Sequence, residues 1–134
     1  MPWDSAEPNQ GFTRGAPWLP LAKEHQALSV AAQQADEDSA LAFSRAMVAF
    51  RQGSGAMRLG ELEFIDAPEP VLAFVRADEG ERIACVFNLS DAPAFPTIPQ
   101  LEGAELLGVR AGDAELRGGS LGLSPYAAVF LRLP

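Results

Sequence analysis

The sequence is poor in residues that make covalent cross-links or basic surfaces. Its one cysteine, Cys85, excludes a disulfide within the chain and fits a reducing compartment, so we expect a cytoplasmic protein. The single lysine, Lys23, stands among nine scattered arginines in a chain of formal net charge −8. Nucleic acids and anionic membranes are bound through clustered basic side chains, so we expect neither as a partner. No apolar run approaches the ~18 residues that span a bilayer.

Clusters of metal-binding or nucleophilic residues are also missing. The only histidine, His25, is far from Cys85, and no group of His, Cys, Asp and Glu has ligand spacing. We therefore expect no metal site and no cofactor. The stretch 118–122 reads GGSLG and matches the G-x-S-x-G nucleophile elbow, which needs a histidine later in the chain. Because His25 lies upstream, a glycine-rich turn is the better interpretation.

Two acidic residues are the nearest approach to a catalytic pair. Glu61 and Glu63 would share one face of a strand at roughly 6.5–7 Å, which overlaps the spacing of glycosidase carboxylates. Alternation with Leu62 and Phe64 predicts that the two glutamates lie on the face opposite the core. A solvated strand face is therefore favoured over a small hydrolase site.

Two further polar groups favour structural roles. Cys85 lies among apolar neighbours in a predicted strand, which is typical of a small buried hydrophobic residue rather than a reactive thiolate. The triplet Asn88-Leu89-Ser90 has the form of a glycosylation site, but no signal peptide is recognisable. We expect Asn88 to make structural hydrogen bonds near a strand end.

Residues 1–35 are an aromatic loop without helical or strand periodicity. Their first twenty positions hold Trp3, Phe12, Trp18 and four prolines. Aromatic residues are unusual in disordered leaders, because such leaders have nothing to bury them in. Exposed aromatic side chains in loops contact sugars or partner proteins. The alternative is that they pack on another domain.

Residues 36–52 are predicted to form one helix. Asp36 is a suitable N-cap, and the acidic residues that follow it suit the positive end of the helix dipole. Phe43, Met47 and Phe50 recur at spacings of three and four, which indicates one apolar stripe. Gly53 and Gly55 are expected to end the helix.

From residue 57 onward the pattern changes to short β-type segments. Runs rich in β-branched and aromatic residues alternate with turn sequences, including Asp78-Glu79-Gly80 between two strong strands. The predicted strand segments are RLGELEFID, PVLAFVRAD, ERIACVFNLSD, AELLGVRAG and PYAAVFLRLP. Five to eight strands at this spacing predict an antiparallel β-sandwich or barrel. Four phenylalanines alternate as core residues would: Phe64, Phe74, Phe87 and Phe130.

These segments, taken in order, resemble a known enzyme family. The first part of the chain contains the motifs MPWD, GF, PWLP and SVAAQQADEDSALAFSRAMVAFR, and the second part contains APEPVLAFVR, VFNLSD and SPYAAVFLRL. In this order, they are similar to the late part of α-glucosidases of the oligo-1,6-glucosidase type. These enzymes belong to the α-amylase superfamily, glycoside hydrolase family 13. Trehalose synthases and sucrose-processing enzymes share much of the pattern.

The resemblance implies that the chain is the C-terminal part of a longer enzyme, called the parent enzyme below. Residues 1–56 would be the tail end of a catalytic (β/α)8 barrel, comprising the aromatic loop 1–35 and the helix 36–52. Residues 57–134 would be the C-terminal β-sandwich domain. The family's aspartate nucleophile, glutamate acid/base and second aspartate would all lie upstream, so no catalytic residue is expected in this chain, and the chain by itself should be inactive and structural.

The same resemblance gives the expected sites and partners. The catalytic barrel of the same polypeptide would be the main partner, docked through Phe43, Met47 and Phe50, and the parent enzyme would hydrolyse α-glucosidic bonds of small oligosaccharides with retention. Trp3 and Trp18 are the candidates for residues near the substrate. Without a barrel, the helix 36–52 could mediate self-association. The alternative function is a stand-alone β-sandwich that binds carbohydrate or protein.

Overall fold

The computed structural model describes residues 1–134, except for the side chain of Arg110. The chain divides into two compact units, residues 1–47 and residues 48–134. None of its described helices has both the length and the apolar character needed to cross a lipid bilayer.

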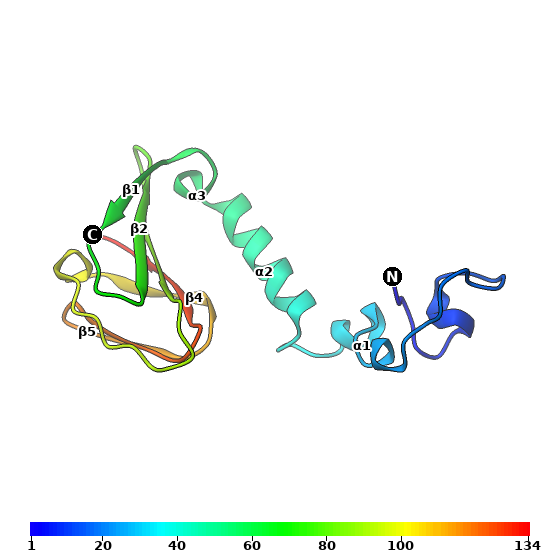
Figure 1. Cartoon of the computed structure of the whole chain (residues 1–134). Coiled ribbons are helices and arrows are strands. Elements are labelled where there is room, and N and C mark those ends of the chain that lie inside the picture. Colours follow the sequence, from blue (N-terminus) through cyan, green and yellow to red (C-terminus); the bar gives the residue numbers. More distant parts are fainter. The chain divides into compact units, whose positions relative to one another are not determined.

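The first unit is made of short helical segments joined by loops (Figure 1). Its elements are the 3-10 turns η1 (Pro8–Gly11) and η2 (Lys23–Gln26), the helix α1 (Val30–Gln34) and the start of α2 (Ala40–Gly53). Ser29 caps α1, since its Oγ accepts a hydrogen bond from the backbone N–H of Ala32.

The predicted N-cap of the long helix was wrong. The helix α2 begins at Ala40, and Ser39 is the residue whose Oγ accepts the N–H of Ala42 at 3.1 Å. The Asp36 carboxylate instead accepts the N–H of Asp38 in the preceding turn. The Ser39 hydroxyl also donates to the carbonyl of Gln33 at 2.7 Å, which links the start of α2 to the end of α1.

The second unit is a β-sandwich preceded by the end of α2 and by α3 (Gly55–Leu59). Its strands in the described chain are β1 (Glu61–Ile65), β2 (Val71–Ala77), β3 (Arg82–Asn88), β4 (Glu105–Ala111), β5 (Ala114–Arg117), β6 (Ser120–Leu123) and β7 (Ala128–Arg132). Five strands form an antiparallel sheet in the order β1-β2-β3-β7-β4, and β5 pairs with β6. The predicted antiparallel sandwich is confirmed.

The β2–β3 and β5–β6 turns are formed by residue types that favour tight turns. At the predicted turn 78–80, Asp78 Oδ1 accepts the N–H groups of Gly80 and Glu81, which closes the β2–β3 hairpin. Gly118 and Gly119 join β5 to β6 with φ values of 51° and 80°. Two consecutive left-handed residues are typical of a tight hairpin, so the interpretation of this stretch as a turn is confirmed.

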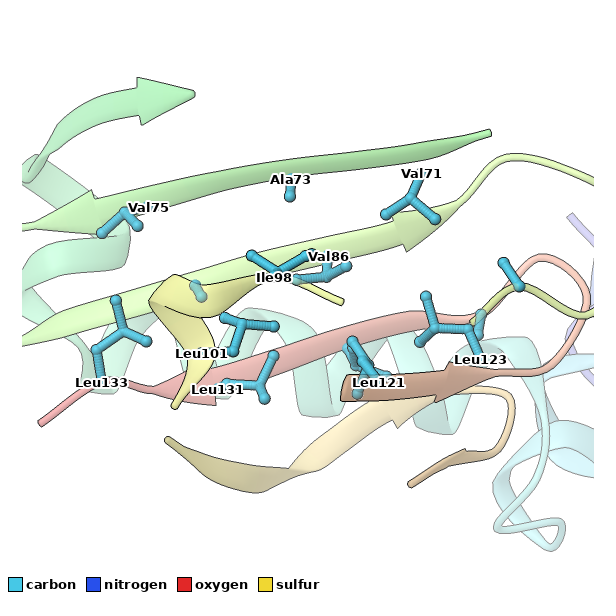
Figure 2. Packing of buried hydrophobic residues seen from close by; sticks show 14 residues of the cluster. Val71, Ala73, Val75, Val86, Ile98, Leu101, Leu121, Leu123, Leu131 and Leu133 are labelled. Carbon is cyan, nitrogen blue, oxygen red and sulfur yellow. The ribbon is translucent and has the colours of Figure 1, made fainter. Parts of the chain in front are cut away.

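The core lies between the two sheets (Figure 2). From the five-stranded sheet, Val75, Val86 and Leu131 point toward Ile98, Leu101 and Leu121 of the second layer (Figure 2). The second layer is widened by bridges from residues 94 and 97 to β6. This packing produces one continuous hydrophobic core for the second unit.

The predicted assignment of faces on β1 and β2 was wrong. Glu63 pairs with Val75 and Phe64 pairs with Phe74, and directly opposed residues of an antiparallel pair share a face. Because Val75 belongs to the core, Glu63 lies on the core side of the sheet, at its exposed edge. The four phenylalanines predicted as core residues lie on the opposite face of the sheet, where Phe130 is buried as predicted but Phe64 is 70% exposed. Aliphatic side chains of valine, leucine, isoleucine and alanine form the core cluster instead.

Candidate functional site

The backbone of Trp3 is held from two directions. Its N–H donates to the carbonyl of Gln10 at 2.8 Å, and its own carbonyl accepts the N–H of Ala31 at 2.9 Å. The carbonyl of Pro2 likewise accepts the N–H of Val30 at 3.0 Å, so the leader satisfies two free N–H groups at the start of α1. The indole itself is 51% exposed. The fold therefore fixes the main chain of Trp3 and leaves its ring available for a contact.

The turn opposite Trp3 is strained. Asn9 and Gln10 have φ values of 52° and 55°, a left-handed conformation that is uncommon for residues other than glycine. The Asn9 amide supports the turn by donating to the carbonyls of Thr13 and Gly15, both at 3.0 Å. Gln10 is buried, and its Oε1 has no hydrogen-bond partner among the described residues. Such strain costs roughly 1–3 kcal/mol per residue and is concentrated at functional sites.

Sequence reasoning missed this turn. The signal was the triplet Asn9-Gln10-Gly11, since asparagine followed closely by glycine favours left-handed turns. A Cβ on Gly11, whose φ is 70°, would lie 3.3 Å from the Cβ of Trp3. Gly11 thus permits the close approach between the turn and the tryptophan.

Trp18 is in a different situation from Trp3. It is 87% exposed, and residues 16–21 make no hydrogen bond within the described part of the chain. Neither indole takes part in an aromatic pair with another described residue. The structure thus gives Trp3 a defined support and gives Trp18 none.

The apolar stripe of the helix is split between different surroundings. Phe43 is exposed and Met47 is half-buried. Phe50 packs against Phe130 of β7, with ring centroids 5.2 Å apart. One of the three predicted docking residues therefore already has a partner within the second unit.

The first unit has an unusual interior. Its only buried residues are polar: Gln10, Ser29 and Ser39. No hydrophobic side chain of residues 1–47 is buried within the described structure, although the segment has defined helices and capping hydrogen bonds. Burial of apolar surface is the main favourable term in folding, so this segment lacks its own core.

The remaining polar candidates have structural surroundings. Asn88 is buried, donates to the carbonyls of Ala92 and Ser124 at 2.7 and 2.9 Å, and accepts from Ser90, as the sequence predicted. Cys85 is fully buried beside Met57, and burial raises the pKa of its thiol to about 11, although the nearby Arg76 guanidinium acts in the opposite direction. His25 lies in η2. Among the described residues, no group of three or more acidic, His or Cys side chains could hold a metal ion.

Two family models match the chain. Residues 62–129 match the maltogenic amylase C-terminal domain, and residues 1–60 match the α-amylase catalytic domain. The boundary between the two matches falls just before the first strand of the sandwich.

Curated relatives match over nearly all of the chain. A probable α-glucosidase of Rhizobium meliloti (strain 1021) is 34% identical over 133 residues, which are 99% of this chain and 24% of that protein. The oligo-1,6-glucosidase of Heyndrickxia coagulans is 28% identical over 99% of this chain and 23% of its own length. The chain thus spans about a quarter of the length of these relatives.

Solved structures agree with these relatives. The α-glucosyl transfer enzyme XgtA is 39% identical with a TM-score of 0.88, over 100% of this chain and 25% of that one. The trehalulose synthase MutB from Pseudomonas mesoacidophila MX-45 is 28% identical with a TM-score of 0.83, over 99% of this chain and 24% of that one. With matches of this extent to both of its parts, the chain belongs to the α-amylase superfamily, glycoside hydrolase family 13, and is similar to the C-terminal part of its glucosidases.

Proposed function

We propose that this chain is the C-terminal part of an α-glucosidase that hydrolyses α-glucosidic bonds of small oligosaccharides with retention, and that its role there is structural. The observation that carries this proposal is the absence of a buried hydrophobic side chain in residues 1–47 of the described structure. A segment with ordered helices and exposed Met1, Trp3, Phe12 and Phe43 needs another body to cover it. The match of residues 1–60 to the α-amylase catalytic domain supports a catalytic barrel as that body.

We propose that catalysis and docking are carried out by different parts of the polypeptide. In a retaining enzyme of this kind, a nucleophile and an acid/base flank the scissile bond about 5–5.5 Å apart. Glu61 and Glu63 stand on an exposed edge strand and are not proposed for this role. We assign the catalytic carboxylates to the part of the polypeptide outside this chain, and docking on that part to Phe43 and Met47.

Trp3 is our first candidate for a contact with substrate. Its backbone N–H donates to Gln10 and its carbonyl accepts from Ala31, which holds it beside a strained turn, and its half-exposed indole can stack on a sugar ring. Trp18 is the second candidate and lacks this support. In the parent enzyme, Trp3→Ala should raise KM for maltose by about tenfold, since a lost aromatic contact costs ~1–2 kcal/mol. Trp18→Ala tests the second candidate in the same assay. Unchanged kinetics in Trp3→Ala would remove Trp3 from the site, and unchanged kinetics in both variants would remove both indoles.

The proposal is tested on the polypeptide that the source cells make. An antibody raised against residues 48–134 should detect a product about four times the 14.3 kDa of this chain, because the relatives are about four times its length. The purified product should hydrolyse p-nitrophenyl α-glucoside, with the α-anomer of glucose appearing first by NMR. A product of 14.3 kDa that binds maltooligosaccharide without hydrolysing it would instead establish the stand-alone binding module.

A further inference from the structure

Four phenylalanines on the outer face of the five-stranded sheet and Phe50 of α2 form a continuous aromatic row. Ring centroids are separated by 5.2 Å for Phe50–Phe130, 6.1 Å for Phe130–Phe87, 5.8 Å for Phe87–Phe74 and 6.2 Å for Phe74–Phe64. These separations lie within the range of favourable aromatic pairs. The row crosses β7, β3, β2 and β1 in their order in the sheet.

One end of the row is covered and the other is bare. Phe130 is buried, because Phe50 packs on it, and the same face is covered near Cys85 by Met57 of α3. At the opposite end Phe64 is 70% exposed, and Leu62 on the same face of β1 is 47% exposed. The row therefore loses its cover toward the edge of the sheet.

The residues that cover the buried end come from a particular part of the chain. Phe50 and Met57 both lie within residues 1–60, the segment that matches the α-amylase catalytic domain. Residues of the segment that matches the catalytic domain therefore cover one end of the outer face and leave the other end, at Leu62 and Phe64, exposed. The relatives continue for about three quarters of their length outside the matching region.

We infer that the bare end of the row, formed by Leu62, Phe64, Leu72 and Phe74, is covered by an apolar surface of the catalytic domain that lies outside this chain. The inference rests on the proposed function and adds the surface through which it operates. Continuity with the Phe50–Phe130 contact favours this occupant over a second copy of the chain. It also explains the sequence of β1, since a bare hydrophobic edge strand is an aggregation hazard.

The test uses Phe64→Cys as a probe and Phe95→Cys as the matched control. Phe95 is 81% exposed and its ring lies 3.7 Å from the position of a Cβ on Gly122 of β6, in the second sheet. The native Cys85 should not be alkylated, because it is fully buried. Alkylation at each position is followed by peptide mass spectrometry, in this chain by itself and in the full-length polypeptide of the source organism.

Position 64 should be alkylated at least about tenfold more slowly in the full-length polypeptide than in the 134-residue chain, as expected for a desolvated interface residue. Position 95 should react at the same rate in both. Equal rates at position 64 in a full-length enzyme that hydrolyses α-glucosides would overturn the inference and leave the proposed function standing. A full-length product of only 14.3 kDa would overturn both.

A second variant separates the catalytic domain from a second copy as the occupant. Phe64→Ser should leave the mass of the isolated chain in sedimentation unchanged and should speed tryptic cleavage after Arg58 in the full-length enzyme by about tenfold. Phe95→Ser should do neither. If the isolated chain is a dimer that Phe64→Ser dissociates, and cleavage of the full-length enzyme is unchanged, the face is a self-association surface and the inference is wrong.

Discussion

At the scale of single residues, buried polar groups hold the ends of the sandwich together. Asn88 uses both ends of its side-chain amide, donating to two loop carbonyls and accepting from Ser90. Each of these groups would be costly to bury without a partner. Cys85 is the opposite case, because its thiol is buried with only the weak sulfur contact to Met57 at 3.9 Å.

The buried thiol predicts a pH dependence at the alkaline end. Burial raises the pKa of Cys85 from 9.0 to about 11 in the folded state, so the unfolded chain loses its proton first as the pH rises. The contribution of Cys85 to stability is complete below pH 9 and is lost as the pH rises toward 11. We expect the free energy of unfolding to fall by about 1–2 kcal/mol over that interval.

The measurement is urea unfolding at pH 8 and at pH 11 for the unmodified chain and for Cys85→Ala. The alanine variant lacks the titrating thiol and retains every other alkaline group. Its stability should therefore change less between the two pH values than that of the unmodified chain. The same loss in both proteins would show that the thiol is not responsible.

At the scale of secondary-structure elements, the junction between α2 and α3 is fixed by the β2–β3 hairpin. Ser54 caps α3 by accepting the N–H of Met57 at 3.1 Å, and its hydroxyl donates to the carboxylate of Glu81. Gly55 packs directly against the carboxylate of Asp78. The hairpin turn is thus both a strand connection and a support for the helix end.

Two neighbouring glycines should respond in opposite ways to alanine. A Cβ at position 55 would clash with Asp78 Oδ2, and Asp78 cannot easily move, because its Oδ1 accepts two backbone hydrogen bonds. Gly55→Ala should destabilise the chain by roughly 1–3 kcal/mol. A Cβ at position 53 would meet no atom within 4 Å, so Gly53→Ala should stabilise it by roughly 0.5–1 kcal/mol. Thermal unfolding of the two variants side by side measures both effects, and a loss of stability in Gly53→Ala would contradict the open space at that position.

At the scale of the whole molecule, the two units differ in what holds them together. The second unit encloses a continuous core between two sheets, as Figure 2 shows. The first relies on turns and caps without a buried hydrophobic side chain in the described structure. A unit without a core opens at a small cost in free energy.

Limited proteolysis of the isolated chain should reveal this difference. Trypsin should cleave after Arg14, Lys23 and Arg45 in the first unit at least about tenfold faster than after Arg76 and Arg82 in the sheet. A stable product close to residues 48–134 is expected by mass spectrometry. Equal cleavage of both units, or resistance of residues 1–47, would show that the first unit is stable by itself.

Sequence pattern was enough for the elements of the second unit. Alternation located β1 to β4 and β7, Asp78-Glu79-Gly80 located the hairpin between β2 and β3, and GGSLG was rightly interpreted as a turn. The short strands β5 and β6 on either side of that turn were not predicted as separate elements, because four-residue strands carry too little periodicity. The family, too, followed from motifs in order along the chain.

The sequence by itself determined the family and the antiparallel sandwich, because both depend on local patterns of residue type along the chain. Only the tertiary structure decided which face of the sheet is the core. Along β2 both faces are apolar, so alternation between Phe74 and Val75 cannot distinguish them. The pairing of Phe64 with Phe74, and the packing of Val75 against the second layer, settle the choice, since one face has a sheet to pack on and the other has only the end of a helix.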